Sequence, residues 1–145
     1  MRQNITVDFD QVLAFESVQN TGWIVLGTGV LKPIKAIHDL VREKHREGFD
    51  IHCVSFRSLK DRQEMIDFCK QYELPIESFT CTDSKTKTPI LKKLNSVLHI
   101  DDSLSVCVAC RMSEIDALFV DCGQLFDVSQ KELAETFNTI KVELD

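Results

Sequence analysis

The chain has 145 residues, of which 43% are hydrophobic and 28% are charged, and its formal net charge is −6. This length suits one domain with a substantial core, and the composition is that of an ordinary globular protein. The acidic balance argues against broad electrostatic binding to nucleic acid, which requires a basic face, although it leaves room for a local basic cleft. No apolar run approaches the length of a membrane span, so we expect no membrane partner.

The N-terminal residues lead directly into an apolar stretch, so no signal peptide is expected. Six cysteines lie within or beside apolar segments, as free core thiols do: Cys53, Cys69, Cys81, Cys107, Cys110 and Cys122. Cys107 and Cys110 form a single CxxC, and the lack of a second pair in the sequence favours a structural role over zinc binding. Free thiols predict a reducing, cytoplasmic setting.

The first predicted strand, Ile5 to Val7, runs into two carboxylates one residue apart, Asp8 and Asp10. The strand must end near Asp8 because protein interiors rarely accept unpaired charges. Side chains alternate along a strand, so both acids can point the same way. Two carboxylates in this position suit Mg²⁺ and, through it, phosphate. From this stretch alone, a strand that ends in a charged turn is an equal alternative.

Residues 14–30 contain glycine-bearing turns on both sides of Trp23 to Leu26, a pattern that predicts a hairpin or flap beside the end of the first strand. From there Phe15 and Trp23 could stack on a nucleobase, but core packing is the favoured interpretation for each. Pro33 is expected to open a helix that ends near Gly48.

Strands and helices alternate through the rest of the chain. Strands are expected at 51–54, 75–81, 97–100 and 117–120, and helices at 61–72, 89–94, 103–115 and 129–137. Ser129 is expected to cap the last helix, and the tail from Thr139 is either a strand or a fraying end. This alternation predicts one α/β domain over residues 1–145, a three-layer Rossmann-like fold with a parallel sheet of about five strands and helices on both faces.

In such a sheet the active site lies beyond the carboxyl ends of the strands. Polar and charged residues follow three of these ends: Ser55 after the second strand, Lys85 and Lys87 after the third, and Asp101 and Asp102 after the fourth. We therefore expect them to meet the two acids of the first strand. The four histidines show no metal-ligand spacing, and His52 and His99 on the strands are expected to be packed or hydrogen-bonded.

These residues resemble the motifs of the haloacid dehalogenase (HAD) superfamily of phosphohydrolases. The stretch Asp8 to Leu13 is similar to the first motif, DxDx(T/V)(L/V), and Val54-Ser55 to the second, an apolar strand that ends in Ser or Thr. Lys87 or Lys85 is similar to the third, a lysine at a helix start, and Ile100-Asp101-Asp102 to the fourth, an apolar strand that ends in paired acids. The four motifs occur in the family's order.

The resemblance implies a Mg²⁺-dependent phosphomonoester hydrolase that acts through a covalent aspartyl-phosphate. Asp8 would be the nucleophile and Asp10 the general acid and base. Mg²⁺ would bind Asp8, the backbone carbonyl of Asp10, and Asp101, with Asp102 as a second ligand or a holder of water. Asp102 also fits the N-cap of the following helix. Gln11 stands where many relatives have glycine, which bears on the local turn rather than on the chemistry.

The resemblance also assigns residues around the phosphate. Ser55 would donate a hydrogen bond to a phosphoryl oxygen, and the lysine would neutralise developing charge. Lys87 is preferred because it lies closer to the helix start, and Lys85 is the alternative. Phe56 and Arg57 are further substrate-binding candidates, although a surface salt bridge is the more ordinary role for Arg57.

The spacing of the motifs implies a member without a cap domain. The first motif is followed by room for a flap but not for a folded cap, and one helix, one strand and their loops fill the gap between the second and third motifs. An open site could take a bulky phosphorylated end of a nucleic acid or protein, or could gain a lid by oligomerising. Small phosphate esters such as nucleotides fit as well.

Three other functions are alternatives to this one. A non-catalytic binding or regulatory module with the same fold would most easily lose Asp10, which is present. A receiver domain would carry its phosphoacceptor at the end of the third strand, where Cys81 and Thr82 lie and no acid appears before Asp83. A phosphotransferase or dehalogenase of the HAD superfamily would carry the same motifs.

Overall fold

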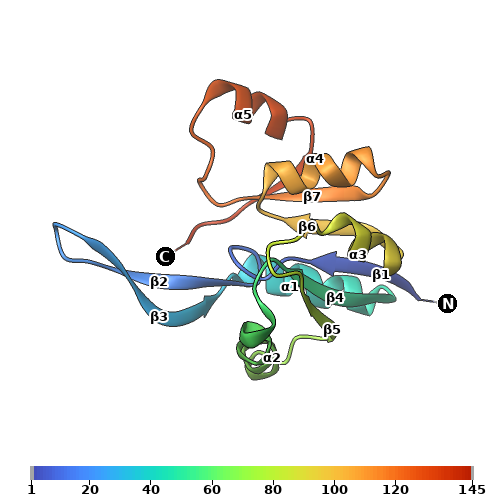
Figure 1. The fold of residues 1–145 in the computed structure, drawn as a ribbon, viewed down its shortest axis with the longest axis horizontal. Coiled ribbons are helices and arrows are strands. Elements are labelled where there is room, and N and C mark those ends of the chain that lie inside the picture. Colours follow the sequence, from blue (N-terminus) through green and yellow to red (C-terminus); the bar gives the residue numbers. More distant parts are fainter. Residues whose placement is uncertain (1, 145) are drawn as a thin grey trace.

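A parallel six-stranded sheet forms the centre of the computed structural model, which describes residues 2–144 (Figure 1). The sheet has the order β5-β4-β1-β6-β7-β8, and each neighbouring pair is parallel. Its strands are β1 (Gln3–Val7), β4 (Phe49–Ser55), β5 (Ile76–Cys81), β6 (Ser96–Asp101), β7 (Asp116–Asp121) and β8 (Asn138–Lys141). The chain leaves β1 toward β4 and later returns to its other side at β6, so the topological switch point lies between β1 and β6.

Helices cover both faces of this sheet. They are α1 (Lys35–Arg46), α2 (Arg62–Gln71), α3 (Thr88–Lys93), α4 (Leu104–Met112) and α5 (Val128–Ala134). Cys53 of β4 belongs to a core with α1 and α2, whereas the next residue, Val54, belongs to a core with α3 and α4. Because successive strand side chains point to opposite faces, these two cores lie on opposite sides of the sheet. The predicted three-layer fold is confirmed, with six strands in place of about five.

The predicted flap is a separate two-stranded sheet of β2 (Ala14–Asn20) and β3 (Val25–Pro33), and it extends away from the six-stranded sheet (Figure 1). Phe15, at its base, is 8% exposed and packs in the core as expected. Trp23, at its tip, is 95% exposed, so the prediction of core packing is wrong for this residue. The reason is that, among residues 2–144, no second layer of structure covers the far part of the hairpin.

Several predicted element ends are shifted by one to three residues. Pro33 does not open the helix, because it pairs with Ala14 as the last residue of β3. Ser103, not Asp102, caps α4, and its hydroxyl accepts from the amide of Val106. The cap of α5 is likewise Asp127 rather than Ser129. The side chain of an N-cap residue accepts from the amide three residues later, which selects these two positions.

The C-terminal tail forms β8 beside β7, so the strand alternative is the one that the structure adopts. The helix expected over 61–72 is α2, preceded by the single 3₁₀ turn η1 (Leu59–Asp61). All six cysteines are free, with Cys107 and Cys110 buried on α4. Within residues 2–144, every helix is too short or too polar to cross a bilayer.

Candidate active site

Two buried acids lie side by side where the central strands end. Asp8 follows β1 directly and Asp101 is the last residue of β6. The register pairs Val7 with Ile100, and the amide of Asp8 donates to the carbonyl of Ile100 at 2.9 Å. The β1–β6 pairing therefore brings together two carboxylates that are far apart in the sequence, at the topological switch point where open α/β sheets bind ligands.

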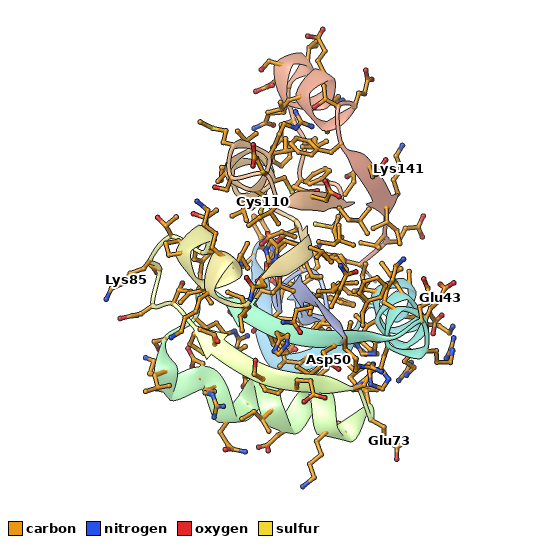
Figure 2. The ribbon with its side chains drawn as sticks, turned by 90° about the vertical axis from the view of Figure 1, so that its right-hand side faces the viewer. Glu43, Asp50, Glu73, Lys85, Cys110 and Lys141 are labelled. Carbon is orange, nitrogen blue, oxygen red and sulfur yellow. The ribbon has the colours of Figure 1, made fainter. Side chains whose placement is uncertain are left out.

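Lys87 joins these two acids. Its Nζ lies 3.0 Å from Asp8 Oδ1 and 2.7 Å from Asp101 Oδ2, and the residue is only 2% exposed. The ring of Phe56 covers the ammonium group, with 4.6 Å between Nζ and the ring centre. Burial lowers the pKa of Lys87, but the charges of the two acids outweigh it and raise this pKa above its ordinary value. Lys85, in contrast, is exposed and extends into solvent (Figure 2). Of the two candidate lysines, only Lys87 reaches the acids.

A third acid completes a group of oxygen ligands. Asp8, Asp101 and Asp102 each offer a carboxylate oxygen, and these oxygens lie within 4.8 Å of one another. Burial raises the pKa of Asp8 well above its ordinary value, and the charge of Asp101 raises it further. The same two causes raise the pKa of Asp102 to about 6. An all-oxygen donor set whose negative charges crowd together fits a hard divalent cation such as Mg²⁺.

Three donors hold the Asp101 carboxylate in place. Its Oδ2 accepts from Lys87 and from Nε2 of His99 at 2.8 Å, and its Oδ1 accepts from the amide of Ser103 at 3.0 Å. Burial acts to raise the pKa of Asp101, but the hydrogen bond from His99 and the charge of Lys87 hold it below its ordinary range. Burial also lowers the pKa of His99, although Asp101 opposes this. Asp101 is therefore ionised and His99 neutral near pH 7.

Asp10 lies at the mouth of the site rather than among the buried acids. Its side chain is 48% exposed, and its two oxygens accept from Nε and Nη2 of Arg57, each at 2.9 Å. Arg57 also donates to Glu64 of α2, and its guanidinium lies 5.0 Å from the ring centre of Phe9. The hydrogen bond to Asp10 raises the pKa of Arg57 above its ordinary value. This bidentate pair fixes the position of Asp10.

The end of β4 contributes Ser55, which is buried, and its hydroxyl accepts from the amide of Arg57 at 3.1 Å. Beside it lies Thr82, which follows β5 and whose amide donates to the carbonyl of Ser55. The hydroxyl of Thr82 is buried without a hydrogen-bond partner, which is costly unless a ligand supplies one. Sequence reasoning did not select Thr82 as a site residue, although its place after a strand end was the available signal.

The turn that carries the first motif has a left-handed residue. Gln11 has a φ of 63°, in the left-handed region that favours glycine, so the backbone here has the conformation for which glycine is the preferred residue. The amide of Gln11 donates to the carbonyl of Ala14, and Asp10 forms an isolated bridge with Ala14. The tight turn between the first motif and β2 therefore places Asp10 beside the base of the hairpin.

The chain matches a solved structure over nearly its whole length. This is the crystal structure of a "putative beta-phosphoglucomutase from Thermotoga maritima", with a TM-score of 0.62, 10% identity, and 96% of this chain and 94% of that chain covered. At this identity the likeness concerns the fold, a three-layer α/β arrangement around a parallel sheet. No family model matches the sequence, and a search of curated proteins gives no match. In this fold, the four loops that carry Asp8, Ser55, Lys87 and Asp101 follow strands β1, β4, β5 and β6 at one edge of the sheet.

Proposed function

We propose that the chain, as a single HAD-like domain, is a Mg²⁺-dependent phosphomonoester hydrolase that acts through an aspartyl-phosphate on Asp8. The observation that supports this most is the buried Lys87, which links Asp8 to Asp101 beside a group of three carboxylates. A buried lysine that holds two acids at a topological switch point is suited to bind a phosphoryl group, because it offsets negative charge where that charge gathers. Mg²⁺ would be held by Asp8, Asp101 and Asp102 together with the backbone carbonyl of Asp10.

In the first step, an oxygen of the Asp8 carboxylate attacks phosphorus, and the bond from phosphorus to the ester oxygen breaks. Asp10 donates its proton to that leaving oxygen. The charge of Lys87 opposes the effect of burial on the pKa of Asp8 and so favours the ionised carboxylate. With the hydroxyl of Ser55, Lys87 also holds the phosphoryl oxygens. When bound, Mg²⁺ offsets the repulsion between the phosphoryl group and the attacking carboxylate.

In the second step, Asp10, now ionised, accepts a proton from water as the water oxygen attacks phosphorus. The bond between phosphorus and Asp8 breaks, inorganic phosphate leaves, and Asp8 regains its carboxylate. Both oxygens of Asp10 accept from Arg57 in the resting protein. One of these two hydrogen bonds has to break before Asp10 can donate a proton to the leaving oxygen. Arg57 therefore positions Asp10 through one oxygen and releases the other for the substrate.

The proposed substrate is a phosphorylated small molecule or the phosphorylated end of a macromolecule, taken into a site without a cap domain. Only the hairpin separates the first motif from α1, and only η1, α2 and β5 separate Ser55 from the loop of Lys87. Phe56, which is partly exposed above Lys87, and Arg57 are the side chains that a substrate would meet first. The six free cysteines support a reducing, cytoplasmic location.

The test is the hydrolysis of an aryl phosphate, with and without Mg²⁺, by wild type and by Asp8→Asn. We expect Asp8→Asn to abolish turnover and to leave the thermal transition nearly unchanged. The exposed Asp67 on α2 provides the matched control, Asp67→Asn, which should keep full activity. Undiminished turnover by Asp8→Asn would falsify the proposal.

A phosphotransferase is the second candidate, and the solved structure described as a beta-phosphoglucomutase is the observation that favours it. In that case the phosphoryl group on Asp8 passes to an alcohol of a second molecule instead of to water. Incubation with a sugar phosphate, followed by analysis of both free phosphate and isomeric sugar phosphates, separates the two reactions. A non-catalytic module would produce neither.

A further inference from the structure

A buried chain of hydrogen bonds reaches Asp101 from inside the sheet. Nε2 of His99 lies 2.8 Å from Asp101 Oδ2, and Nδ1 of His99 lies 2.8 Å from the hydroxyl of Thr6. The hydroxyl of Thr6 is in turn 2.8 Å from that of Ser96. Thr6 of β1 and His99 of β6 are register partners with no exposed surface. Asp101 and His99 are two residues apart on one strand, so their side chains share a face.

The proton positions in this chain follow from what each group can donate. An ionised carboxylate only accepts, so the hydrogen of the neutral His99 ring lies on Nε2. The bare Nδ1 then needs a donor, and the hydroxyl of Thr6 is the group within reach. The hydroxyl of Ser96 donates to Thr6 or to the carbonyl of Leu98, which lies 2.9 Å away. Each of these side chains therefore has a hydrogen-bond partner, and the series of hydrogen bonds ends with the Nε2–H of His99 donating to Asp101.

This arrangement leaves Asp101 little freedom to rotate. His99 and Lys87 both donate to Oδ2, while the amide of Ser103 donates to Oδ1. Lys87 also pairs with Asp8, so it is shared with the reacting carboxylate. Two of the three donors are side chains, Lys87 and His99. Among the contacts of the described residues, only His99 of these two donates to Asp101 without also contacting Asp8. It is fully buried, so it is shielded from substrate.

We propose that His99, held by Thr6 and Ser96, is a positioning residue that fixes the Asp101 carboxylate in the orientation that binds the divalent cation. This inference rests on the proposed function for the role of the cation, but it is judged by cation binding alone. Removing a donor that orients a metal-binding side chain typically weakens metal binding by about 10- to 100-fold. A histidine that only satisfies the core would instead affect stability and leave the affinity for the cation unchanged.

The neighbouring strand offers a matched control. His52 of β4 is also hydrogen-bonded through both ring nitrogens, to Ser78 at 2.6 Å and to Asn4 at 3.0 Å. It is the register partner of Thr6, on the other side of β1 from His99. Neither of its partners is a carboxylate. A substitution of His52 therefore perturbs a comparable polar network in the same sheet without touching Asp101.

The experiment measures the dissociation constant for Mg²⁺ by isothermal titration calorimetry, together with the thermal transition, in full-length variants. We expect His99→Leu to weaken Mg²⁺ binding by about 10-fold or more, and His99→Gln, which keeps an N–H donor, to recover part of the loss. Thr6→Val, which does not contact Asp101, should weaken binding by a smaller factor, and Thr6→Ser should restore it. His52→Leu should lower the melting temperature and keep the wild-type affinity. At saturating Mg²⁺, kcat of His99→Gln should approach that of wild type, because His99 touches no reacting atom.

Wild-type affinity in His99→Leu would overturn the inference, as would an equal loss in His52→Leu. If His99→Leu does not fold, His99→Gln and Thr6→Val decide the question, since both keep the shape of the buried side chain closely. Wild type that binds Mg²⁺ but hydrolyses no phosphate ester would contradict the proposed function and leave the positioning role intact. Wild type that binds no Mg²⁺ would overturn both.

Discussion

The acidic site and the β2–β3 hairpin lie on either side of the turn that follows β1, and they differ in which side chains they expose to solvent. At the site, Asp8, Lys87 and Asp101 bury their charges. In the hairpin, Trp23 is 95% exposed, and residues 17–31 contain no charged side chain at all. Globular proteins normally do the reverse in both places. Both inversions cost stability, but the site offsets the cost with specific partners for each charge, whereas the hairpin leaves its apolar side chains uncovered.

The two regions also differ in what determines their shape. The site is built from four strand ends and from contacts between residues far apart in the chain, such as Arg57 with Asp10. The hairpin is built from its own residues: the carboxylate of Glu16 accepts from the amide of Gly29 at 2.9 Å and lies where a Cβ on Gly27 would stand. We therefore expect substitutions at the site to affect activity strongly, and stability wherever they leave a buried charge without a partner. We expect substitutions at the hairpin tip to affect neither.

The largest effect is expected for Lys87→Met. This substitution leaves Asp8 and Asp101 buried without their shared cation, and breaking a buried ion pair in this way typically costs about 3–5 kcal/mol. Loss of the charge that faces the phosphoryl group should lower kcat by about 10²–10³-fold. Urea unfolding and aryl phosphate hydrolysis measure the two effects. Lys85→Met is the control, and because Lys85 is exposed it should resemble wild type in both assays. The reverse result would assign the role to Lys85.

The next effect concerns Arg57→Lys, which keeps the charge but loses the two-point contact with Asp10. General acid catalysis matters most when the leaving group is a poor one. We expect kcat to fall by about 10- to 100-fold for an alkyl phosphate and by clearly less for a nitrophenyl phosphate. Equal losses with both substrates, or a change in KM alone, would show that Arg57 contacts the phosphate instead of positioning Asp10.

A smaller effect, on pH dependence, is expected for Asp102→Asn. Burial raises the pKa of Asp102 from 3.8 to about 6, so the folded state binds this proton more tightly than the unfolded state does. Without Mg²⁺, ionisation of Asp102 therefore lowers the stability of wild type as pH rises from about 4 to about 6, with no further loss above that. The melting temperature of Asp102→Asn relative to wild type should rise over this window and then level off.

Mg²⁺ should reverse this trend, because the cation binds the ionised acid. In wild type, the rise in melting temperature on adding Mg²⁺ should grow as pH increases through about 6, and the growth should be much reduced in Asp102→Asn. A pH-independent difference between the two proteins would show that Asp102 neither titrates in this range nor contributes to the cation site. Scanning calorimetry at several pH values, with and without Mg²⁺, measures both trends.

The same contrast explains what the sequence could and could not predict. The alternation of strands and helices was enough to predict the parallel sheet, and the strand ends were enough to gather Asp8, Ser55 and Asp101 at one edge. The sequence favours Lys87 over Lys85 only by its distance from the helix start, because both lie in one polar loop. The three-dimensional structure decides between them, since only Lys87 points inward. Arg57 and Asp10 are 47 residues apart, so no local pattern reveals their pairing.

Other features that the sequence does not predict lie mostly in exposed parts of the molecule. The exposed strand β8 lacks the apolar alternation that marks a strand, so its sequence does not distinguish a strand from a fraying end. The sequence favours core packing for Trp23, and only the three-dimensional structure shows that none of the described residues covers the tip of the hairpin. Thr6 and Ser96 carry no motif, and they join the site only through the ring of His99.

The smallest effect is expected for the double variant Trp23→Ser/Ile24→Ser at the hairpin tip. Substitutions at exposed positions usually change stability by no more than about 0.5 kcal/mol, and neither side chain contacts the acids. The melting temperature and kcat/KM for an aryl phosphate should therefore match those of wild type. Phe15→Ala, at the base of the same hairpin, should instead cost about 3 kcal/mol or more, because Phe15 is 8% exposed and packs in the main core.

This pair of variants tests whether the hairpin is one unit or two. If the base belongs to the core and the tip to solvent, the loss in Phe15→Ala appears in urea unfolding, and the tip variant loses nothing with a small substrate. A drop in kcat/KM for aryl phosphate in the tip variant would mean that the hairpin closes over the site in solution. In that case the exposed Trp23 would contribute to catalysis, and the contrast between a buried site and an independent hairpin would not hold.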